Sequence, residues 1–379
     1  MTTDLHDLMS ERAERLDPPT LDASAIMAAG DRRVRRRRWT GGAGAAVLCV
    51  AAALAAPAVL GGSGTDGLVA ERPADSEDPV AWVSGSVLHT SPDGPTVDLA
   101  ELGREPISLV QADSGFVFSE ADGSVHAVID DEVVEVGTLQ VPESPRFESD
   151  GDVVAWVDAG EGEPAYAALD LSKGAGVVSL PVRRGYGTPL ERELGMTEAV
   201  AAVDGDTVYL RAPNGARVWR PFAADDQVVS LPVADGTRVV LEDVQNGVFH
   251  YHRAGGTPAA KEEAYVVGPD LSTGVEVESW EGILSPDGRY LVSEMNDENV
   301  VSDTATGARL PFDLGEYSFL AGYRWLDDDT YAALAMKDVS GDRVDLLRCE
   351  VTTGSCEPVV TGLDLLGDSR LVIPIGEGW

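Results

Sequence analysis

The chain has 379 residues, of which 44% are hydrophobic, and 65 acidic residues against 28 basic ones give a formal net charge of −37. This length allows one large domain or two ordinary ones, and the apolar content argues against wholesale disorder. The negative charge excludes nucleic acid as the default partner, because nucleic-acid binding uses a basic surface that neutralises phosphates. The charge is also uneven: residues 1–38 carry 8 Arg and 7 Asp or Glu, so almost all of the acidic excess lies after them.

Residues 1–38 are predicted to form a short cytoplasmic stub. Five apolar residues between Leu5 and Leu16 recur at helical spacing, and Asp17-Pro18-Pro19 ends that helix. We interpret the stub as a topogenic and solubilising tail; the alternative is a docking helix that contacts a cytoplasmic regulator. Its end is a dense basic cluster of six residues: Arg32, Arg33, Arg35, Arg36, Arg37 and Arg38.

An uncharged run of 22 residues follows, from Trp39 to Leu60, which is the length that a helix needs to cross the hydrocarbon layer. Arginines stay on the cytoplasmic side of such a span, so the N-terminus is expected inside and the acidic remainder outside. The run is longer than the apolar part of a signal peptide and starts later, which favours a retained signal anchor. Ala56-Pro57-Ala58 resembles a cleavage site, so removal of the anchor remains the alternative.

Residues 61–78 are predicted to be a linker rich in Gly, Ser, Asp and Pro, and residues 79–379 to be a single extracytoplasmic all-β domain. This part alternates short runs rich in Val, Leu and Tyr with dipeptides that favour tight turns between strands. Many short strands with regular turns indicate a sandwich, a barrel or a propeller. The turn dipeptides are Asp93-Gly94, Asp122-Gly123, Asp150-Gly151, Asp204-Gly205, Asn214-Gly215, Asp235-Gly236, Asn246-Gly247 and Asp287-Gly288.

Internal repeats favour the propeller. Val80-Ala81-Trp82-Val83 recurs as Val154-Ala155-Trp156-Val157, with weaker echoes at 116–118 and 200–203. Several spacings between repeats are near forty residues, as in four-stranded propeller blades. This predicts seven blades, with six or eight as alternatives, and a last strand at 370–375 that completes a short first blade and closes the ring. Similar units begin near residues 79, 104, 145, 197, 238, 281 and 318.

Two segments resemble known propellers. Leu284-Ser285-Pro286-Asp287-Gly288-Arg289-Tyr290-Leu291-Val292 is similar to the strand–turn–strand motif of TolB-like and WD-repeat-like bacterial propellers, and Thr90-Ser91-Pro92-Asp93-Gly94 is a partial second copy. Tyr323-Arg324-Trp325-Leu326-Asp327-Asp328-Asp329-Thr330 resembles a strand–turn of membrane-anchored actinobacterial members. The resemblance covers roughly residues 79–379. It implies blades, and it transfers no catalytic residue to this chain.

Cys349 and Cys356 bracket a turn at Thr353-Gly354, so they are expected to face each other across a hairpin and form a disulfide in an oxidising exterior. Two free thiols are the alternative. His250 and His252 lie two positions apart on one strand face and could share a metal, although packing between blades is the simpler interpretation. Asp327-Asp328-Asp329 and the group Asp338, Asp342 and Asp345 could offer oxygen ligands to calcium. No other cofactor is expected.

Catalysis has little support in the sequence, because no nucleophile elbow, zinc-binding His-Glu-x-x-His or phosphate loop is present. Trp82, Trp156, Trp219, Trp280 and Trp325 could stack on sugars, but their apolar surroundings favour core packing. The predicted function is therefore a membrane-anchored propeller that binds a protein or an envelope component. The alternatives are an extracytoplasmic hydrolase or lyase and a transmembrane sensor. A cluster of carboxylates with perturbed pKa values near the axis would favour the enzyme, and a large apolar patch would favour the binding protein.

Overall fold

The computed structural model describes most of the chain after residue 78. The predicted stub, membrane span and linker, residues 1–78, lie outside the described residues. In the part of the chain that is described, no helix is long and apolar enough to cross a membrane. The described residues are 79–84, 87–90, 96–98, 106–129, 132–140, 146–160, 164–182, 199–212, 215–224, 228–233, 238–254, 264–279, 281–295, 298–365 and 371–375.

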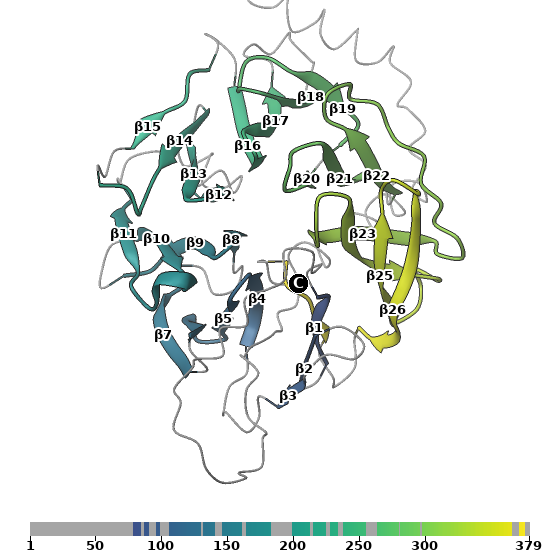
Figure 1. Cartoon of the computed structure of the whole chain (residues 1–379), viewed down its shortest axis with the longest axis horizontal. Coiled ribbons are helices and arrows are strands. Elements are labelled where there is room, and N and C mark those ends of the chain that lie inside the picture. Colours follow the sequence, from purple (N-terminus) through teal and green to yellow (C-terminus); the bar gives the residue numbers. More distant parts are fainter. Residues whose placement is uncertain are drawn as a thin grey trace, which may run out of the picture. The chain divides into compact units, whose positions relative to one another are not determined.

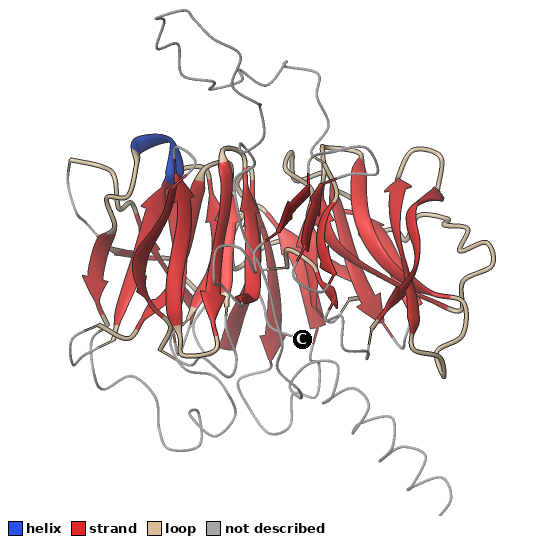
Figure 2. Cartoon of the chain, turned by 90° about the horizontal axis from the view of Figure 1, so that it is seen from below, coloured by secondary structure: helices blue, strands red, loops and turns tan. Residues whose placement is uncertain are grey.

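Seven separate antiparallel sheets are arranged around a common axis (Figure 1), which confirms the prediction of a seven-bladed β-propeller. The strands run between two faces of the ring, where the turns and loops gather (Figure 2). Each predicted beginning lies within a few residues of a first strand in the chain order of a blade, and in blades 2 to 7 that strand is the innermost one. Among the described residues the only helical element is the 3-10 turn η2 (Leu171–Lys173).

In six blades the strands follow the chain order from the axis outward. Blade 2 contains β4 (Pro106–Ala112), β5 (Gly115–Glu120), β6 (Ser124–Ile129) and β7 (Glu132–Thr138), and blade 3 contains β8 (Phe147–Asp150), β9 (Val153–Asp158), β10 (Ala165–Asp170) and β11 (Val178–Pro181). Blade 4 contains β12 (Val200–Asp204), β13 (Thr207–Ala212), β14 (Gly215–Trp219) and β15 (Val229–Ser230), and blade 5 contains β16 (Arg238–Gln245), β17 (Val248–Ala254), β18 (Ala264–Gly268) and β19 (Val275–Val277). Blade 6 has three described strands, β20 (Glu281–Leu284), β21 (Tyr290–Met295) and β22 (Glu298–Asp303), and blade 7 contains β23 (Phe319–Trp325), β24 (Thr330–Met336), β25 (Arg343–Glu350) and β26 (Ser355–Asp364).

Blade 1 closes the ring with strands from both ends of the propeller. Its order is β27 (Leu371–Val372), β1 (Ala81–Ser84), β2 (Val87–Thr90) and β3 (Thr96–Asp98). The closing pair is short: Val83 faces Val372 and Ser84 faces Leu371. This confirms the predicted closure by a C-terminal strand. Because β27 is the innermost strand, β1 is the second strand of blade 1, just as β9 is the second strand of blade 3. The repeated Val-Ala-Trp-Val therefore lies in equivalent strands. The echo at 200–203 lies in an innermost strand and is not equivalent.

Tight turns between the first and second strands of the blades define one face of the ring, which we call the turn face. Gly151, Gly205, Gly247 and Gly288 take positive φ angles in these turns, as the dipeptide pattern predicts. At Gly288 a side chain would also collide with the neighbouring blade, because an added Cβ would lie 2.7 Å from Cγ2 of Val248. The opposite face, which holds the connections from second to third strands and from blade to blade, is the loop face.

The core lies in the seams between blades. Trp156 is fully buried in the seam of blades 2 and 3, and Trp219 is fully buried in the seam of blades 3 and 4. The outer strands of blades 3 and 4 use the same hexapeptide, Val-Val-Ser-Leu-Pro-Val, at 177–182 and 228–233. Leu180 packs into the seam of blades 3 and 4, and Leu231 packs into the seam of blades 4 and 5. The two copies of the hexapeptide therefore pack in the same way in two successive seams.

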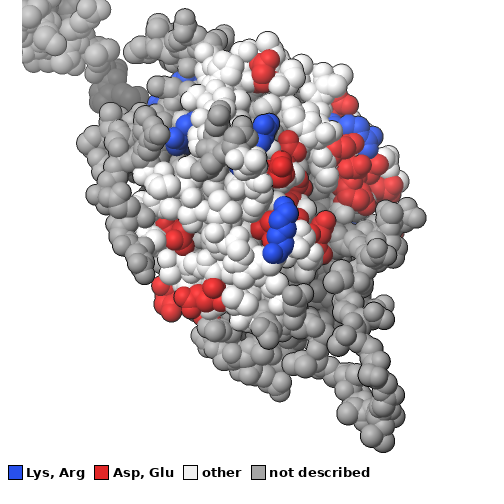
Figure 3. Space-filling model, turned by 60° about the vertical axis from the view of Figure 1, so that its left-hand side comes forward, with Lys and Arg blue, Asp and Glu red and all other residues white. Residues whose placement is uncertain are grey.

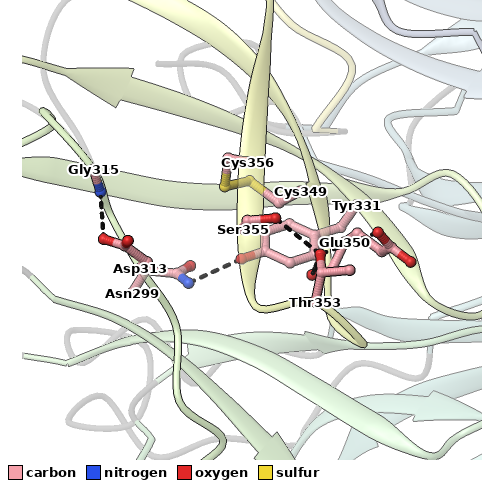
Figure 4. Close-up of a disulfide and its surroundings, with 9 residues drawn as sticks. All are labelled: Asn299, Asp313, Gly315, Tyr331, Cys349, Glu350, Thr353, Ser355 and Cys356. Carbon is pink, nitrogen blue, oxygen red and sulfur yellow. Dashed lines mark hydrogen bonds between the residues drawn. A yellow bond between two sulfur atoms is a disulfide. The ribbon is translucent and has the colours of Figure 1, made fainter.

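The predicted disulfide between Cys349 and Cys356 is confirmed (Figure 4). The two residues are direct cross-strand partners in the β25–β26 hairpin, with their Cα atoms 4.0 Å apart. Cys349 is fully buried next to Tyr331 on β24, whose hydroxyl accepts a hydrogen bond of 3.0 Å from the Asn299 amide of blade 6. The disulfide thus holds the outer hairpin of blade 7 against its seam with blade 6.

Removing this disulfide by the double change Cys349→Ser and Cys356→Ser is expected to lower the free energy of unfolding by about 2–3 kcal/mol, because the bond closes a short loop in the unfolded chain. Urea unfolding of the oxidised protein and of the variant measures the difference. A reducing agent should lower the stability of the unchanged protein to that of the variant and leave the variant unaffected. A variant as stable as the oxidised protein would contradict the prediction.

Candidate functional site

Four charged side chains from innermost strands come together near the axis of the ring, and we call them the axial cluster: Glu148 and Asp150 on β8, Asp243 on β16, and Arg324 on β23. Glu148 and Asp150 lie on the same side of β8 because side chains in a strand alternate. Asp243 and Arg324 each follow a register shift in their strand. Such bulges turn a side chain out of the regular alternation and occur often beside functional sites.

Two carboxyl groups of the axial cluster have raised pKa values. Burial raises the pKa of Asp243 to about 7, and the negative charges of Glu148 and Asp150 act in the same direction, while hydrogen bonds from backbone N–H groups oppose them. Burial also raises the pKa of Asp150, and Arg324 opposes that shift. A carboxyl group that titrates near pH 7 is suited to proton transfer, so this feature is the one that the sequence analysis associated with an enzyme.

The same carboxylates also link neighbouring blades through hydrogen bonds. Asp243 accepts backbone N–H bonds of 2.7 Å on each oxygen, from Val244 on one and from Leu284 of blade 6 on the other. Asp150 accepts a bond of 2.7 Å from the N–H of Gly205 in the turn of blade 4. Both oxygens of Asp243 thus accept backbone hydrogen bonds, which gives the carboxyl group a structural role and fixes its position.

Arg324 bridges the ring across its closing blade. Its Nη1 donates a hydrogen bond of 2.7 Å to the carbonyl oxygen of Gln111, which belongs to β4 of blade 2, although Arg324 belongs to blade 7. The Gln111 amide in turn lies 3.5 Å from the carbonyl oxygen of Pro79, just before β1. Blade 1 contributes only the two-residue strand β27 at this position, so Arg324 reaches past it to the next blade.

The histidines do not form a metal site in the part of the chain that the structure describes. His250 and His252 lie on one face of β17, as predicted, but both rings pack on Tyr265, with ring centroids 5.8 and 4.8 Å away. His250 is fully buried, and its burial lowers its pKa to about 4. No group of three or more His, Cys, Asp or Glu residues that could hold a metal occurs among the described residues. The packing interpretation therefore fits these residues better than the shared metal.

The predicted calcium ligands cap turns instead of converging. Asp327 accepts the N–H groups of Asp329 and Thr330 at 2.8 and 2.7 Å. Asp338 accepts the N–H of Ser340 at 2.9 Å, and Asp345 accepts the Tyr317 hydroxyl at 2.9 Å. These oxygens are engaged within separate turns and strands of blade 7, so the expectation of calcium gains no support from them.

Blade 2 contains an arrangement of Ser, His and Glu that the sequence analysis did not single out. Nε2 of His126 lies 3.0 Å from Glu120 and 3.1 Å from the hydroxyl of Ser124. In a hydrolytic triad the serine and the carboxylate contact opposite ring nitrogens, whereas here both meet the same one. His126 is also fully buried and stacks on Phe118 at 5.1 Å. The three residues therefore stabilise the second-to-third strand turn of the blade.

Few large hydrophobic side chains are exposed on the described surface. Only Val229 and Val339 are large exposed hydrophobic residues among those described, so no extended apolar patch is present there. Figure 3 shows acidic groups gathered at several places on one side of the molecule, next to a few basic groups and a broad uncharged area. Trp82, Trp156, Trp219 and Trp325 are buried, which confirms their prediction as core residues; Trp280 lies outside the described residues. A partner of this surface would meet charged and polar groups more than apolar ones.

The raised pKa of Asp243 predicts a pH dependence of stability. Its carboxyl group prefers the protonated form in the folded protein, so the favourable contribution is complete below the unfolded pKa and is lost as pH rises through about 7. As the pH rises from 5 to 8, the unchanged protein is expected to lose about 2 kcal/mol of unfolding free energy. The Asp243→Asn variant cannot titrate at this position, so it should not show this loss. Urea unfolding across this range measures the shift.

Asp270, in a turn of the same blade, provides the matched control. Hydrogen bonds from Ser272 and Thr273 lower its pKa to about 2, so its contribution is present at neutral pH and is lost only under acid conditions. The difference between Asp270→Asn and the unchanged protein should therefore stay constant from pH 5 to 8. Parallel pH profiles for Asp243→Asn and the unchanged protein would disprove the assignment of the pH dependence to Asp243.

Comparison with known proteins finds similarity to solved structures at low sequence identity. No protein-family model matches the sequence, and no curated protein sequence matches it. Among solved structures, TolB from Acinetobacter baumannii is similar with a TM-score of 0.38 and 13% identity, over 78% of this chain and 65% of that one. Apo AztD from Citrobacter koseri gives a TM-score of 0.44 and 13% identity, over 80% of this chain and 99% of that one.

A third similar structure is a prolyl endopeptidase, with a TM-score of 0.48 and 12% identity over 79% of this chain. The chain spans 47% of that protein's length and just under two thirds of the A. baumannii TolB. The similar structures thus include two TolB proteins. At these identities the likeness concerns the fold alone.

Proposed function

We propose that the chain is a membrane-anchored propeller that binds a protein or an envelope component outside the cytoplasm. The observation that carries this proposal is the set of carboxylates that accept backbone N–H groups of the next blade, of which Asp150 and Asp204 are members. Carboxylates held in this way provide an ordered acidic surface for a positively charged partner. Because the described residues expose little apolar area, the binding is expected to use charged and polar contacts.

The proposed location rests on two features of different parts of the chain. The Cys349–Cys356 disulfide favours an oxidising compartment for the propeller. The uncharged run 39–60 and the arginines before it favour a single membrane crossing with the N-terminus inside. In this arrangement the propeller has the layout of membrane-anchored actinobacterial proteins, and its acidity keeps it away from the anionic lipid surface.

The topology can be tested on cells that lack an outer barrier. Protease added to intact cells is expected to digest the propeller and to spare residues 1–38, detected with tags at either end. Permeabilised cells, in which both parts are cut, are the control. Digestion of the stub with survival of the propeller would overturn the proposed orientation. Crosslinking in the native membrane, followed by identification of partners on each side, tests the binding function; a propeller that captures nothing outside would contradict it.

An extracytoplasmic hydrolase or lyase is the second candidate, favoured by the pKa of Asp243 near 7 beside Glu148 and Asp150. In that case Asp243 would donate the proton and a neighbouring carboxylate would act as base or nucleophile. A panel of chromogenic glycosides and esters, tested at pH 5 to 8, distinguishes the two candidates. Turnover that disappears in both Asp243→Asn and Glu148→Gln would favour the enzyme, and turnover unaffected by both would remove this argument for it.

A further inference from the structure

A surface pocket of about 470 Å³ lies at the seam of blades 5 and 6, away from the axial cluster. We call it the seam pocket. Its residues come from three strands of blade 5, from the segment that follows them, and from β21 of blade 6. It combines acidic, aromatic and apolar side chains in one concave surface. The lining residues are His252, Ala264, Tyr265, Glu276, Val277, Glu278, Ser279 and Met295.

The strands place the pocket on the loop face. Val277 ends β19 and Met295 ends β21, while Ala264 begins β18, and all three ends lie opposite the turn face. The chain enters the propeller from the turn face, because Pro79 precedes β1, the second strand of its blade. The seam pocket is therefore on the side of the ring opposite Pro79.

One wall of the pocket is aromatic and its base is neutral. The ring of Tyr265 is stacked on His252 at 4.8 Å with an angle of 28° between the rings. At the base, Ser279 is 3% exposed and its hydroxyl lies 3.4 Å from Nε2 of the buried His250. Burial keeps His250 uncharged at neutral pH, so no positive charge lies beneath the pocket.

The described residues at the rim of the pocket carry more negative than positive charge. Glu276 and Glu278 are exposed there, and Arg253 neutralises only Glu276, through a bond of 2.8 Å. Among the described residues Glu278 has no ion-pair partner. A carboxylate beside an aromatic ring and apolar side chains suits a planar cation with an aliphatic stem, because the cation can contact the ring and pair with the carboxylate together.

We propose that the seam pocket receives an arginine side chain from the protein that binds the propeller. The guanidinium would pair with Glu278 and lie against Tyr265, and the stem would contact Val277 and Met295. Lysine fits less well, since its ammonium cannot stack as a plane. The inference rests on the proposed binding function and deepens it, because it names the side chain that the partner must present.

The test uses the full chain in nanodiscs and two small probes, N-acetylarginine methylamide and its uncharged citrulline analogue, observed by saturation-transfer NMR. The arginine probe is expected to bind at least threefold more tightly than the citrulline probe. Glu278→Gln and Tyr265→Leu should each weaken arginine binding at least threefold, while Tyr265→Phe retains it. Glu135→Gln, which removes one exposed carboxylate from β7 of blade 2, is the matched control and should change binding less than 1.5-fold.

Equal binding of the two probes would overturn the proposal. So would an equal loss in Glu278→Gln and Glu135→Gln, since it would mean attraction to the overall charge of the protein. Glu278 is exposed, so its variant should fold normally, and its thermal unfolding checks this. If crosslinking captures the same outside partner equally with the unchanged protein and with Glu278→Gln, the pocket proposal fails while the binding function stands. If nothing outside is captured, the binding function itself fails.

Discussion

Replacing Trp156 by alanine is expected to lower the free energy of unfolding by about 3–5 kcal/mol. The indole is fully buried in the seam of blades 2 and 3, where it packs edge-on against Phe147 at 6.2 Å. Alanine leaves a cavity between two rigid sheets that cannot collapse without moving a blade. Urea unfolding followed by circular dichroism measures the loss.

Trp156→Phe is the matched control for this prediction. It keeps an aromatic ring in the seam and should cost clearly less than the alanine change, because less volume is removed. The indole Nε1 lies 3.4 Å from Asp158, a weak contact that phenylalanine also loses, so any difference between the two variants reflects the filled volume. A loss below about 1 kcal/mol for Trp156→Ala would show that the seam repacks and would contradict the rigid-blade argument.

Replacing Arg324 by alanine is expected to lower the free energy of unfolding by about 2–3 kcal/mol, because its charged hydrogen bond to the Gln111 carbonyl is lost and Asp150 loses a favourable cation. The effect should be localised. Since Arg324 links blades 7 and 2 across the closing blade, hydrogen exchange is expected to accelerate first in β1 and β4. Urea unfolding and hydrogen exchange measured by mass spectrometry test the two parts of this prediction.

Arg289→Ala is the control, because Arg289 is an arginine on the same turn face that pairs with Asp287 and Asp329 but is 53% exposed. Exposed ion pairs contribute little, so this variant should lose clearly less stability than Arg324→Ala. If both arginine variants lose the same stability, or if Arg324→Ala speeds exchange equally in all blades, Arg324 has no special role in closing the ring.

The blade architecture could be predicted because each blade repeats local signals. Asp204-Gly205 and Asp287-Gly288 indicate turns because their glycines adopt positive φ angles, which few other residues adopt readily. Trp82 and Trp156 indicate equivalent strands. The disulfide was predictable for the same reason, since Cys349 and Cys356 flank a turn within one hairpin. Patterns of this kind depend only on residues that are close in the sequence, so they can be recognised without knowing the tertiary structure.

The axial cluster and the seam pocket could not be predicted in this way. Glu148, Asp243 and Arg324 meet only because three strands that are distant in the sequence converge on the axis. Asp243 and Arg324 also follow register shifts, which cannot be predicted from amino-acid composition. Among 65 acidic residues nothing distinguishes Asp243 until its burial is known. The two histidines of β17 were noticed from their spacing, but their partner Tyr265 comes from the next strand, and the pocket beside it also needs blade 6.

The closing pair of β1 and β27 has a consequence for how the protein is made. During synthesis the strands of the six other blades are complete before residues 371–375 are added. Until then β1 has no partner on its inner side, so the nascent propeller is an open arc. The free edge of β1 could then pair with a strand of another chain, which makes dimerisation by strand exchange or aggregation the main hazard of late folding. Contacts between such distant residues also form slowly. A folding helper that shields the arc until its last residues arrive would act at the moment when this protein is most vulnerable.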